Sequence, residues 1–178
     1  MRKILISLVG PSGSGKSTVE QELVKKGFRK IISHTSRAMR KGEEDNVDYH
    51  FTDRMFFEKE KDNFIEFVEF AGNFYGAHKD SIESYFSVIV VEPNGAKQIR
   101  KYCEENDIQN ILVSLTISED KQIQRMIKRG DSEESVRSRL QKESIRQEVG
   151  LLDIDQVYCS ECLFLTPENI AELIIQNI

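Results

Sequence analysis

The chain lacks a basic excess, lacks an apolar run long enough to span a bilayer, and has only three cysteines. Its 178 residues include 25 Lys and Arg against 30 Asp and Glu, which gives a formal net charge of -5. This balance leaves no broad basic surface for a nucleic-acid backbone, so a polynucleotide partner is disfavoured. A membrane partner is disfavoured too, because no apolar run reaches the roughly 20 residues that a bilayer span requires.

The cysteine count and the first residues both bear on the compartment. Three cysteines leave at least one thiol unpaired, which is typical of a reducing interior. The start, MRKILISLVG, has a basic pair before an apolar run, but the run is short and lacks a small-residue cleavage site. We interpret it as a strand rather than a signal peptide, and we expect a cytoplasmic protein.

Cysteine and histidine offer no recognisable metal site. Cys159 and Cys162 form an isolated CxxC, whereas a tetrahedral zinc site needs four ligands and no histidine or second pair lies close in sequence. We therefore expect two small, partly buried side chains near a strand end. The histidines, His34, His50 and His78, are scattered without metal-ligand spacing and are interpreted as ordinary polar residues.

Short apolar runs alternate with helical patterns along the chain, which is typical of an α/β fold with a parallel sheet covered by helices. Residues 3–9 form the first run, SVIVVEP from Ser87 reads as a buried strand stopped by Pro93, and NILVSLTI repeats the pattern. Helical stripes that we expect to pack in the core are Val19, Leu23 and Val24; Ala96, Ile99 and Tyr102; Ile123, Met126 and Ile127; and Ile170, Leu173 and Ile174 after a Thr166 N-cap and Pro167.

Two polar, charged stretches interrupt this rhythm, at about 33 to 80 and 129 to 148. The first has strand-like pieces at YHF and FIEFVEF, and the second is helical by composition but has only Val136, Leu140 and Ile145 as apolar residues. No long repeat, linker or low-complexity tract divides the chain. We expect a single domain over residues 1–178, with a core of 1–32, 86–128 and 149–178 and insertions at 33–85 and 129–148.

VGPSGSGKST, residues 9–18, satisfies the pattern GxxxxGK[ST] directly after an apolar strand and at the start of a helix. In that context glycines let successive backbone N–H groups curl around a phosphate, and the helix N-terminus adds a partial positive charge. Lys16 would bridge the outer phosphate oxygens, and the Ser17 hydroxyl would hold Mg2+. We predict ATP binding by the loop residues Gly10, Pro11, Ser12, Gly13, Ser14, Gly15, Lys16, Ser17 and Thr18.

The stretch SHTSRAMRKGEEDNVDYHF offers a second place for phosphate. Arg37 and Arg40 lie three residues apart among hydroxyl side chains, and two guanidiniums can grip a dianionic monophosphate with paired hydrogen bonds. Tyr49 adds a phenolic donor. Alone, such a charged run is usually a solvated surface. Beside a donor site, a clamp for an acceptor phosphate is favoured.

Taken together, these segments make the sequence resemble the guanylate kinase family. GPSGSGKST, TSRAMRKGEEDNVDYHF, FIEFVEFAGNFYG and an RG followed ten residues later by RL stand in the family's order over nearly the whole chain. The resemblance implies transfer of the ATP γ-phosphate to GMP or dGMP on a P-loop core with a nucleoside-monophosphate-binding insertion (33–85) and an arginine-bearing lid (129–148). We expect small-molecule nucleotide partners, Mg2+ as cofactor, and a monomer or homodimer.

The resemblance also implies roles for individual residues. Glu66 matches the family's guanine-reading glutamate. One carboxylate can accept hydrogen bonds from the adjacent N1–H and N2–H2 donors of guanine, a pair that adenine does not offer. The alternative is that Glu66 has no binding role and simply lies on the exposed side of a strand. The expected acceptor site comprises Ser33, Arg37, Arg40, Tyr49, Glu66, Tyr75 and Glu92. The expected catalytic residues are Lys16, Arg37, Arg129 and Arg139, of which the last two match lid arginines that neutralise charge in the transition state.

The sequence departs from the family pattern at three sets of residues, and the stretch between Tyr75 and Ser87 is also a few residues shorter than is usual in the family. Ala77 stands where a hydroxyl residue is usual, Val90 and Glu92 replace an acidic D-x-D, and Thr116 and Ile117 replace two prolines. Ala77 and Val90 keep open a kinase for another or modified (deoxy)nucleoside monophosphate. Further alternatives are a phosphopeptide-binding guanylate-kinase-like module, although such modules typically lack a working P-loop, and a nucleotide-dependent switch or nonspecific ATPase.

Overall fold

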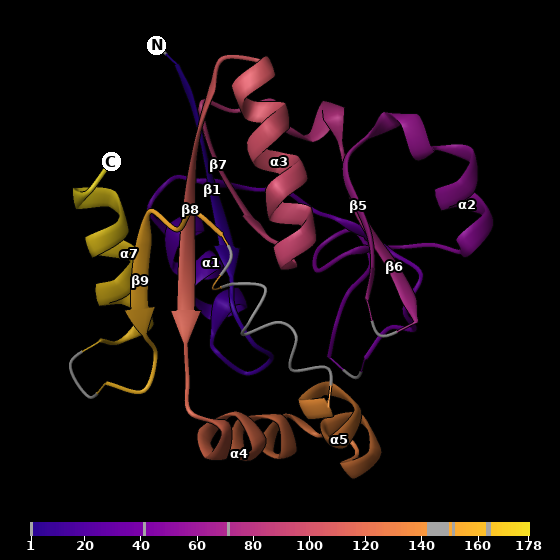
Figure 1. The fold of residues 1–178 in the computed structure, drawn as a ribbon, viewed down its shortest axis with the longest axis vertical. Helices are drawn as coiled ribbons and strands as arrows, with labels where there is room; N and C mark the ends of the chain where they lie inside the picture. Colours follow the sequence, from indigo (N-terminus) through magenta and orange to yellow (C-terminus); the bar gives the residue numbers. More distant parts are fainter. Residues whose placement is uncertain (1, 41, 71, 142–149, 151, 163–164) are drawn as a thin grey trace.

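A parallel sheet forms the centre of the molecule (Figure 1). The structure, a computed structural model, describes all residues except 1, 41, 71, 142–149, 151 and 163–164. Within these described residues the central sheet has five strands in the order β2-β7-β1-β8-β9, and every neighbouring pair is parallel. The strands are β1 (Lys3–Val9), β2 (Arg29–Lys30), β7 (Phe86–Val90), β8 (Ile108–Thr116) and β9 (Gln156–Cys159).

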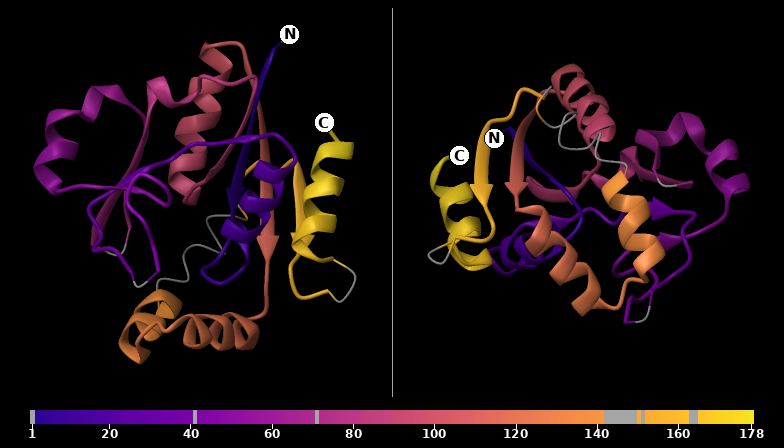
Figure 2. Two further views of the ribbon diagram at one scale, coloured as in Figure 1. Left: turned by 180° about the vertical axis from the view of Figure 1, so that it is seen from behind. Right: turned by 60° about the horizontal axis from the view of Figure 1, so that its bottom comes forward.

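Helices cover both faces of this sheet (Figure 2). α1 (Lys16–Lys25) and α7 (Pro167–Gln176) pack together on one face, and α3 (Pro93–Glu105) covers the other. Alternate residues of β1 explain the two layers: Leu5 belongs to the core cluster with α3, and Ile6 to the cluster with α1 and α7. The predicted α/β class is therefore confirmed.

Two of the predicted core positions are wrong. Val24 is 41% exposed on α1 and Ile127 is 57% exposed on α4 (Glu119–Arg129), whereas Met126 is fully buried. α4 continues past the end of β8, away from the sheet (Figure 1), so only one side of it is covered. An apolar stripe in the sequence predicts which face of a helix packs inward, but it does not predict how much of that face the neighbouring elements cover.

The first polar stretch forms a second sheet, whose strand β5 contacts α3. Over the described residues it has the order β4-β3-β6-β5, with β3 and β6 antiparallel and β5 and β6 antiparallel. The predicted strand pieces YHF and FIEFVEF fall in β4 and β5. The elements are β3 (His34–Thr35), β4 (His50–Phe51), α2 (Arg54–Lys59), a 3-10 turn (Lys61–Asn63), β5 (Phe64–Phe70), β6 (Asn73–His78) and a 3-10 turn (Lys79–Ser81).

The second polar stretch is helical where the structure describes it. α5 (Glu133–Gln141) follows α4 and contacts it. Val136 is buried and Leu140 half-buried, while Ile145 lies outside the described residues. In the part of the chain that the structure covers, no helix is long and apolar enough to cross a membrane.

The three histidines, scattered in sequence, meet in the second sheet. His34 pairs with His50 across β3 and β4, and its ring centroid lies 4.6 Å from that of His50, 4.8 Å from His78 and 5.0 Å from Phe56. No group of three His, Cys, Asp or Glu side chains among the described residues is placed to hold a metal ion. The three rings lie close together because β4, β3 and β6 are neighbours in the second sheet. The spacing of the histidines in the sequence does not reveal this strand order.

This cluster should make the fold sensitive to acid. Burial, with smaller contributions from His50 and His78, lowers the pKa of His34 to about 4. Because an unfolded histidine titrates near 6.5, the unfolded chain binds the proton first as pH falls, so the free energy of unfolding decreases between about pH 6.5 and 4. We expect the wild type to lose about 1 to 3 kcal/mol more than His34→Asn between pH 7 and 4 in urea unfolding followed by circular dichroism. Parallel pH profiles for the two proteins would contradict this expectation.

Candidate active site

The loop between β1 and α1 adopts a conformation that depends on glycine. Gly10, Gly13 and Gly15 have φ of 142°, 78° and 94°, a region that other residues rarely enter. A Cβ on Gly10 would lie 2.3 Å from the carbonyl oxygen of Leu115. The loop therefore curls against β8 and delivers its backbone to the N-terminus of α1, an arrangement that binds anions.

The Lys16 side chain folds back onto the start of this loop. Its Nζ donates hydrogen bonds to the carbonyl oxygens of Gly10 at 2.6 Å and Pro11 at 3.0 Å. Burial lowers the pKa of Lys16, and the positive charges of Arg129 and Arg139 act in the same direction while Glu92 opposes them. A phosphate group would add negative charge and so stabilise the ammonium form.

One cavity of about 810 Å3 joins this loop to the second sheet. It brings together almost every predicted site residue; Gly10 and Pro11 do not line it, but their carbonyl oxygens accept the hydrogen bonds of Lys16, which does. The predicted residues that line it are Ser12, Gly13, Ser14, Gly15, Lys16, Ser17, Thr18, Ser33, Arg37, Arg40, Tyr49, Glu66, Tyr75, Glu92, Arg129 and Arg139.

Arg37 and Arg40 are held in the cavity by the carboxylate of Glu43, a residue of the same polar segment that was not predicted as a site residue. Glu43 accepts two hydrogen bonds from the Arg37 guanidinium, at 3.0 and 2.8 Å, and one from the Arg40 backbone amide at 2.7 Å. The Arg37 guanidinium also lies 5.4 Å from the centroid of the Tyr49 ring. Glu43 thus pairs with both guanidiniums and fixes their direction, and its single negative charge leaves a net positive charge that an anion can bind.

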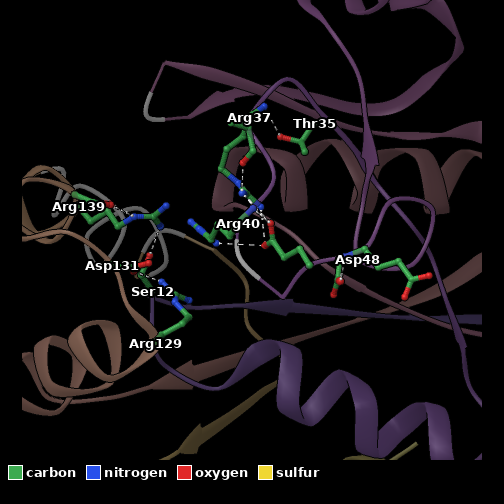
Figure 3. Close-up of polar contacts among 12 residues, drawn as sticks. Ser12, Thr35, Arg37, Arg40, Asp48, Arg129, Asp131 and Arg139 are labelled. Atoms are coloured by element: carbon green, nitrogen blue, oxygen red, sulfur yellow. Dashed lines mark hydrogen bonds and ion pairs between the residues drawn. The ribbon is translucent and has the colours of Figure 1, made fainter.

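The arginines from α4 and α5 meet at a second carboxylate, Asp131 (Figure 3). Arg129 forms an ion pair with Asp131, whose side chain is only 7% exposed. Although burial acts in the opposite direction, this pair holds the pKa of Asp131 below its usual range, and Arg40 and Arg139 reinforce the effect. Arg139 also donates a 2.8 Å hydrogen bond to the Ser12 hydroxyl. No residue pattern marks Asp131 in the sequence, because only the fold places it among three arginines.

Glu66 lies at the base of the cavity and not on the surface. It is 3% exposed, which rules out the reading of Glu66 as the exposed side of a strand. A bulge between Phe64 and Glu66 interrupts the ladder with β6, and the backbone amide of Ala77 donates a hydrogen bond to the carboxylate. A Cβ on Gly95 would lie 2.7 Å from Glu66 Oε2, so α3 approaches the carboxylate closely because this position is glycine.

The environment of Glu66 is unusual for an acidic side chain. Among the described residues, no donor reaches its Oε2. Burial raises the pKa of Glu66 to about 8, the negative charge of Glu92 acts in the same direction, and the Ala77 hydrogen bond opposes it. A buried acceptor without a donor is costly for the fold and is often a place where a ligand supplies the missing partner.

The positions that depart from the family pattern divide into two groups. Val90 lines the cavity, whereas Ala77 does not line it but is fully buried directly across the strand pair from Glu66, which does. Thr116 and Ile117 do not line the cavity; they end β8 and lead into α4.

Arg125 is a cavity residue that the sequence analysis missed. Its guanidinium donates to the carbonyl oxygen of Gly13 at 3.0 Å, and to the hydroxyl and carbonyl oxygens of Ser160 at 3.1 and 2.8 Å. It therefore links α4, the glycine loop and the end of β9. No local signal marked it, since Gly13 and Ser160 are both distant from it in sequence.

A parallel sheet covered by helices, with a glycine loop at the start of α1, defines a P-loop α/β protein. The family model for guanylate kinase matches residues 1–172, and the chain belongs to that family. Among solved structures it is similar to guanylate kinase from Anaplasma phagocytophilum, with 24% identity, a TM-score of 0.68 and coverage of 98% of this chain and 82% of that one. It is also similar to APE1195, with 16% identity, a TM-score of 0.52 and coverage of 98% and 94%. At sequence identities of 24% and 16%, the similarity to these two structures supports the fold and not a shared function.

Proposed function

We propose that this protein transfers the γ-phosphate of ATP to GMP or dGMP, with Mg2+ as cofactor. The observation that carries the proposal is the single cavity in which the phosphate loop, a paired arginine clamp and the buried carboxylate of Glu66 lie together. A site for one nucleotide would need only one set of phosphate-binding groups. Two such sets facing one cavity suit a donor and an acceptor.

On the donor side, the glycine loop and Lys16 would hold the ATP phosphates. The exposed Ser17 hydroxyl, in the first turn of α1 and lining the same cavity, is a suitable oxygen ligand for Mg2+. The described residues contain no acidic cluster able to hold a metal by themselves, which fits an ion bound mainly through substrate phosphates. When bound, Mg2+ would neutralise phosphate charge and orient the triphosphate.

On the acceptor side, Arg37, Arg40, Tyr49 and Tyr75 would hold the monophosphate, whose anionic oxygen needs no protein base. Ionised Glu66 would accept the paired donors of guanine. Arg129 and Arg139 would lie over the transferring group and stabilise its charge, and closure of their segment would exclude water that could otherwise receive the phosphoryl group.

A guanine nucleotide altered on the base, with ribose or deoxyribose, is a second candidate acceptor. Ala77 is buried beside Glu66 and its side chain offers no hydrogen-bond donor. The Ala77 side chain would suit a base that keeps the N1–H and N2–H2 donors of guanine but has no acceptor atom that needs a hydrogen bond from this side chain. The alternatives of a phosphopeptide-binding module or a nonspecific ATPase are less well supported, because they leave the pairing of an intact loop with a second phosphate clamp unexplained.

The test is an ADP-release assay with ATP and Mg2+ against GMP, dGMP, AMP, CMP and UMP, with products separated by chromatography. We expect conversion of GMP, dGMP or both, and little conversion of the others. Equal conversion of AMP would contradict the role of Glu66. Failure with all five, in protein that binds ATP, would favour the modified nucleotide.

A further inference from the structure

Cys159 and Cys162 lie on opposite sides of a tight turn at the end of β9. The Cys162 backbone amide donates to the carbonyl oxygen of Cys159 at 3.3 Å, which closes the turn and brings the two side chains to the same end of the strand. Cys159 is half-buried and Cys162 exposed, so the expectation of two partly buried side chains holds for the first and is wrong for the second. The described residues place no third metal ligand with them. Accessible, adjacent thiols in a CxxC turn are suited to disulfide chemistry.

The two thiols are not equivalent. A hydrogen bond from the Glu161 backbone, together with the one from the Cys162 thiol, lowers the pKa of Cys159, whereas the contact with Cys159 raises the pKa of Cys162. The thiolate is the nucleophile in thiol–disulfide exchange, so Cys159 is suited to the first attack and Cys162 to the second. The third cysteine, Cys103, is 1% exposed, and burial raises its pKa to about 12.

We propose that Cys159 and Cys162 form a reversible redox site that a low-molecular-weight disulfide oxidises to an intramolecular disulfide. The Cys159 thiolate attacks one sulfur of the small disulfide, forms a mixed disulfide and expels one small thiolate. The Cys162 sulfur then attacks Cys159, loses its proton and expels the second. Two electrons pass from the protein dithiol to the small disulfide, which leaves as two thiols.

The turn connects the thiols to the glycine loop. Ser160, between the two cysteines, accepts two hydrogen bonds from Arg125, and Arg125 donates a third to the carbonyl oxygen of Gly13. The neighbouring Glu161 carboxylate accepts from the backbone amide and hydroxyl of Ser118, at 2.8 and 2.7 Å, where α4 begins. The turn therefore contributes to holding both Arg125 and the start of α4.

Closing the disulfide should disturb this connection. The two free thiols must come to a covalent sulfur–sulfur distance of about 2.05 Å, which shifts the Ser160 peptide between them. Arg125 then loses part of its support against the glycine loop. We expect oxidation to weaken ATP binding about tenfold, the effect of losing one hydrogen bond to a charged group. This consequence rests on the proposed function, whereas the formation of the disulfide does not.

The disulfide is tested on the full chain by equilibration with mixtures of reduced and oxidised glutathione, an acid quench, alkylation of free thiols and intact-mass measurement. We expect the wild type to lose two of its three free thiols and two hydrogen masses, and peptide mapping to locate the bond at Cys159 and Cys162. Cys162→Ser should instead accumulate the glutathione adduct at Cys159, because the second attack is absent. The matched control Cys103→Ser should behave like the wild type. A wild type that retains all three thiols at the most oxidising ratio overturns the proposal.

The coupling is tested by titrating ATP and Mg2+ into oxidised protein, freed of glutathione, and into the same sample after reduction with dithiothreitol. We expect the dissociation constant to rise about tenfold on oxidation and to return on reduction. Disulfide formation with unchanged ATP affinity overturns the coupling. Disulfide formation in a protein that binds no ATP in either state contradicts the proposed function and supports the redox site.

Discussion

Replacing Lys16 with alanine is expected to lower kcat for phosphoryl transfer by about 10^3 or more while leaving the protein folded. Removing a single positioned donor from a site of developing charge typically costs 10^2 to 10^3 in rate, and in the proposed function the Lys16 ammonium would contact the transferring phosphate directly. Stability should not suffer, because burial of the Lys16 ammonium is unfavourable, as its lowered pKa indicates. The measurement is single-turnover transfer from ATP to GMP, together with thermal unfolding of both proteins.

Lys25→Ala is the matched control for this substitution. Lys25 lies on the same helix, its side chain is 69% exposed, and it forms an ion pair with Glu22, outside the cavity. We expect wild-type kcat in this variant. A folded Lys16→Ala protein with more than about a tenth of the wild-type rate would be incompatible with a transition-state role for the lysine.

Glu66→Gln is expected to lower the selectivity for GMP over AMP about 10^2- to 10^4-fold. Glutamine keeps the shape of the side chain but presents an amide donor to the paired donors of guanine. Two hydrogen bonds to an ionised carboxylate contribute about 1.5 to 3 kcal/mol each, which corresponds to that range of discrimination. The kcat/KM for GMP should fall and that for AMP should not.

Glu69→Gln is the matched control for Glu66, because Glu69 lies on the same strand with its side chain 57% exposed. Its selectivity should equal that of the wild type. Unchanged discrimination in Glu66→Gln would show that guanine is read elsewhere in the cavity, and it would remove the main support for GMP as the acceptor.

The raised pKa of Glu66 gives the same prediction a pH dependence. At pH 7 the free side chain is mostly protonated, because burial raises its pKa to about 8. Guanine prefers the ionised form, so binding must release a proton and its affinity should rise about tenfold per pH unit up to the pKa and then level off. Guanosine, which lacks a titrating phosphate, isolates this effect in calorimetry. Glu66→Gln should show a flat profile.

The sequence alone determined the features that short windows encode. The glycine loop of residues 9–18 is specified by residue types at fixed spacing, and the alternation of apolar runs with helical stripes specified the α/β class. Arg37 and Arg40 stand three residues apart in one polar segment, so their pairing could be predicted locally. The N-cap at Thr166 was equally local, and its side chain accepts a 3.2 Å hydrogen bond from the Asn169 amide.

Only the tertiary structure decided what depends on segments far apart in the chain. It left Val24 and Ile127 exposed, because the covering surface, and not the stripe itself, sets burial. It gathered three histidines through strand order, buried the Asp131 side chain among arginines from separate segments, and linked Arg125 to Gly13 and to the turn between Cys159 and Cys162. Such contacts carry no periodic or local signature, since they arise when the sheet order sets which loops meet at one edge.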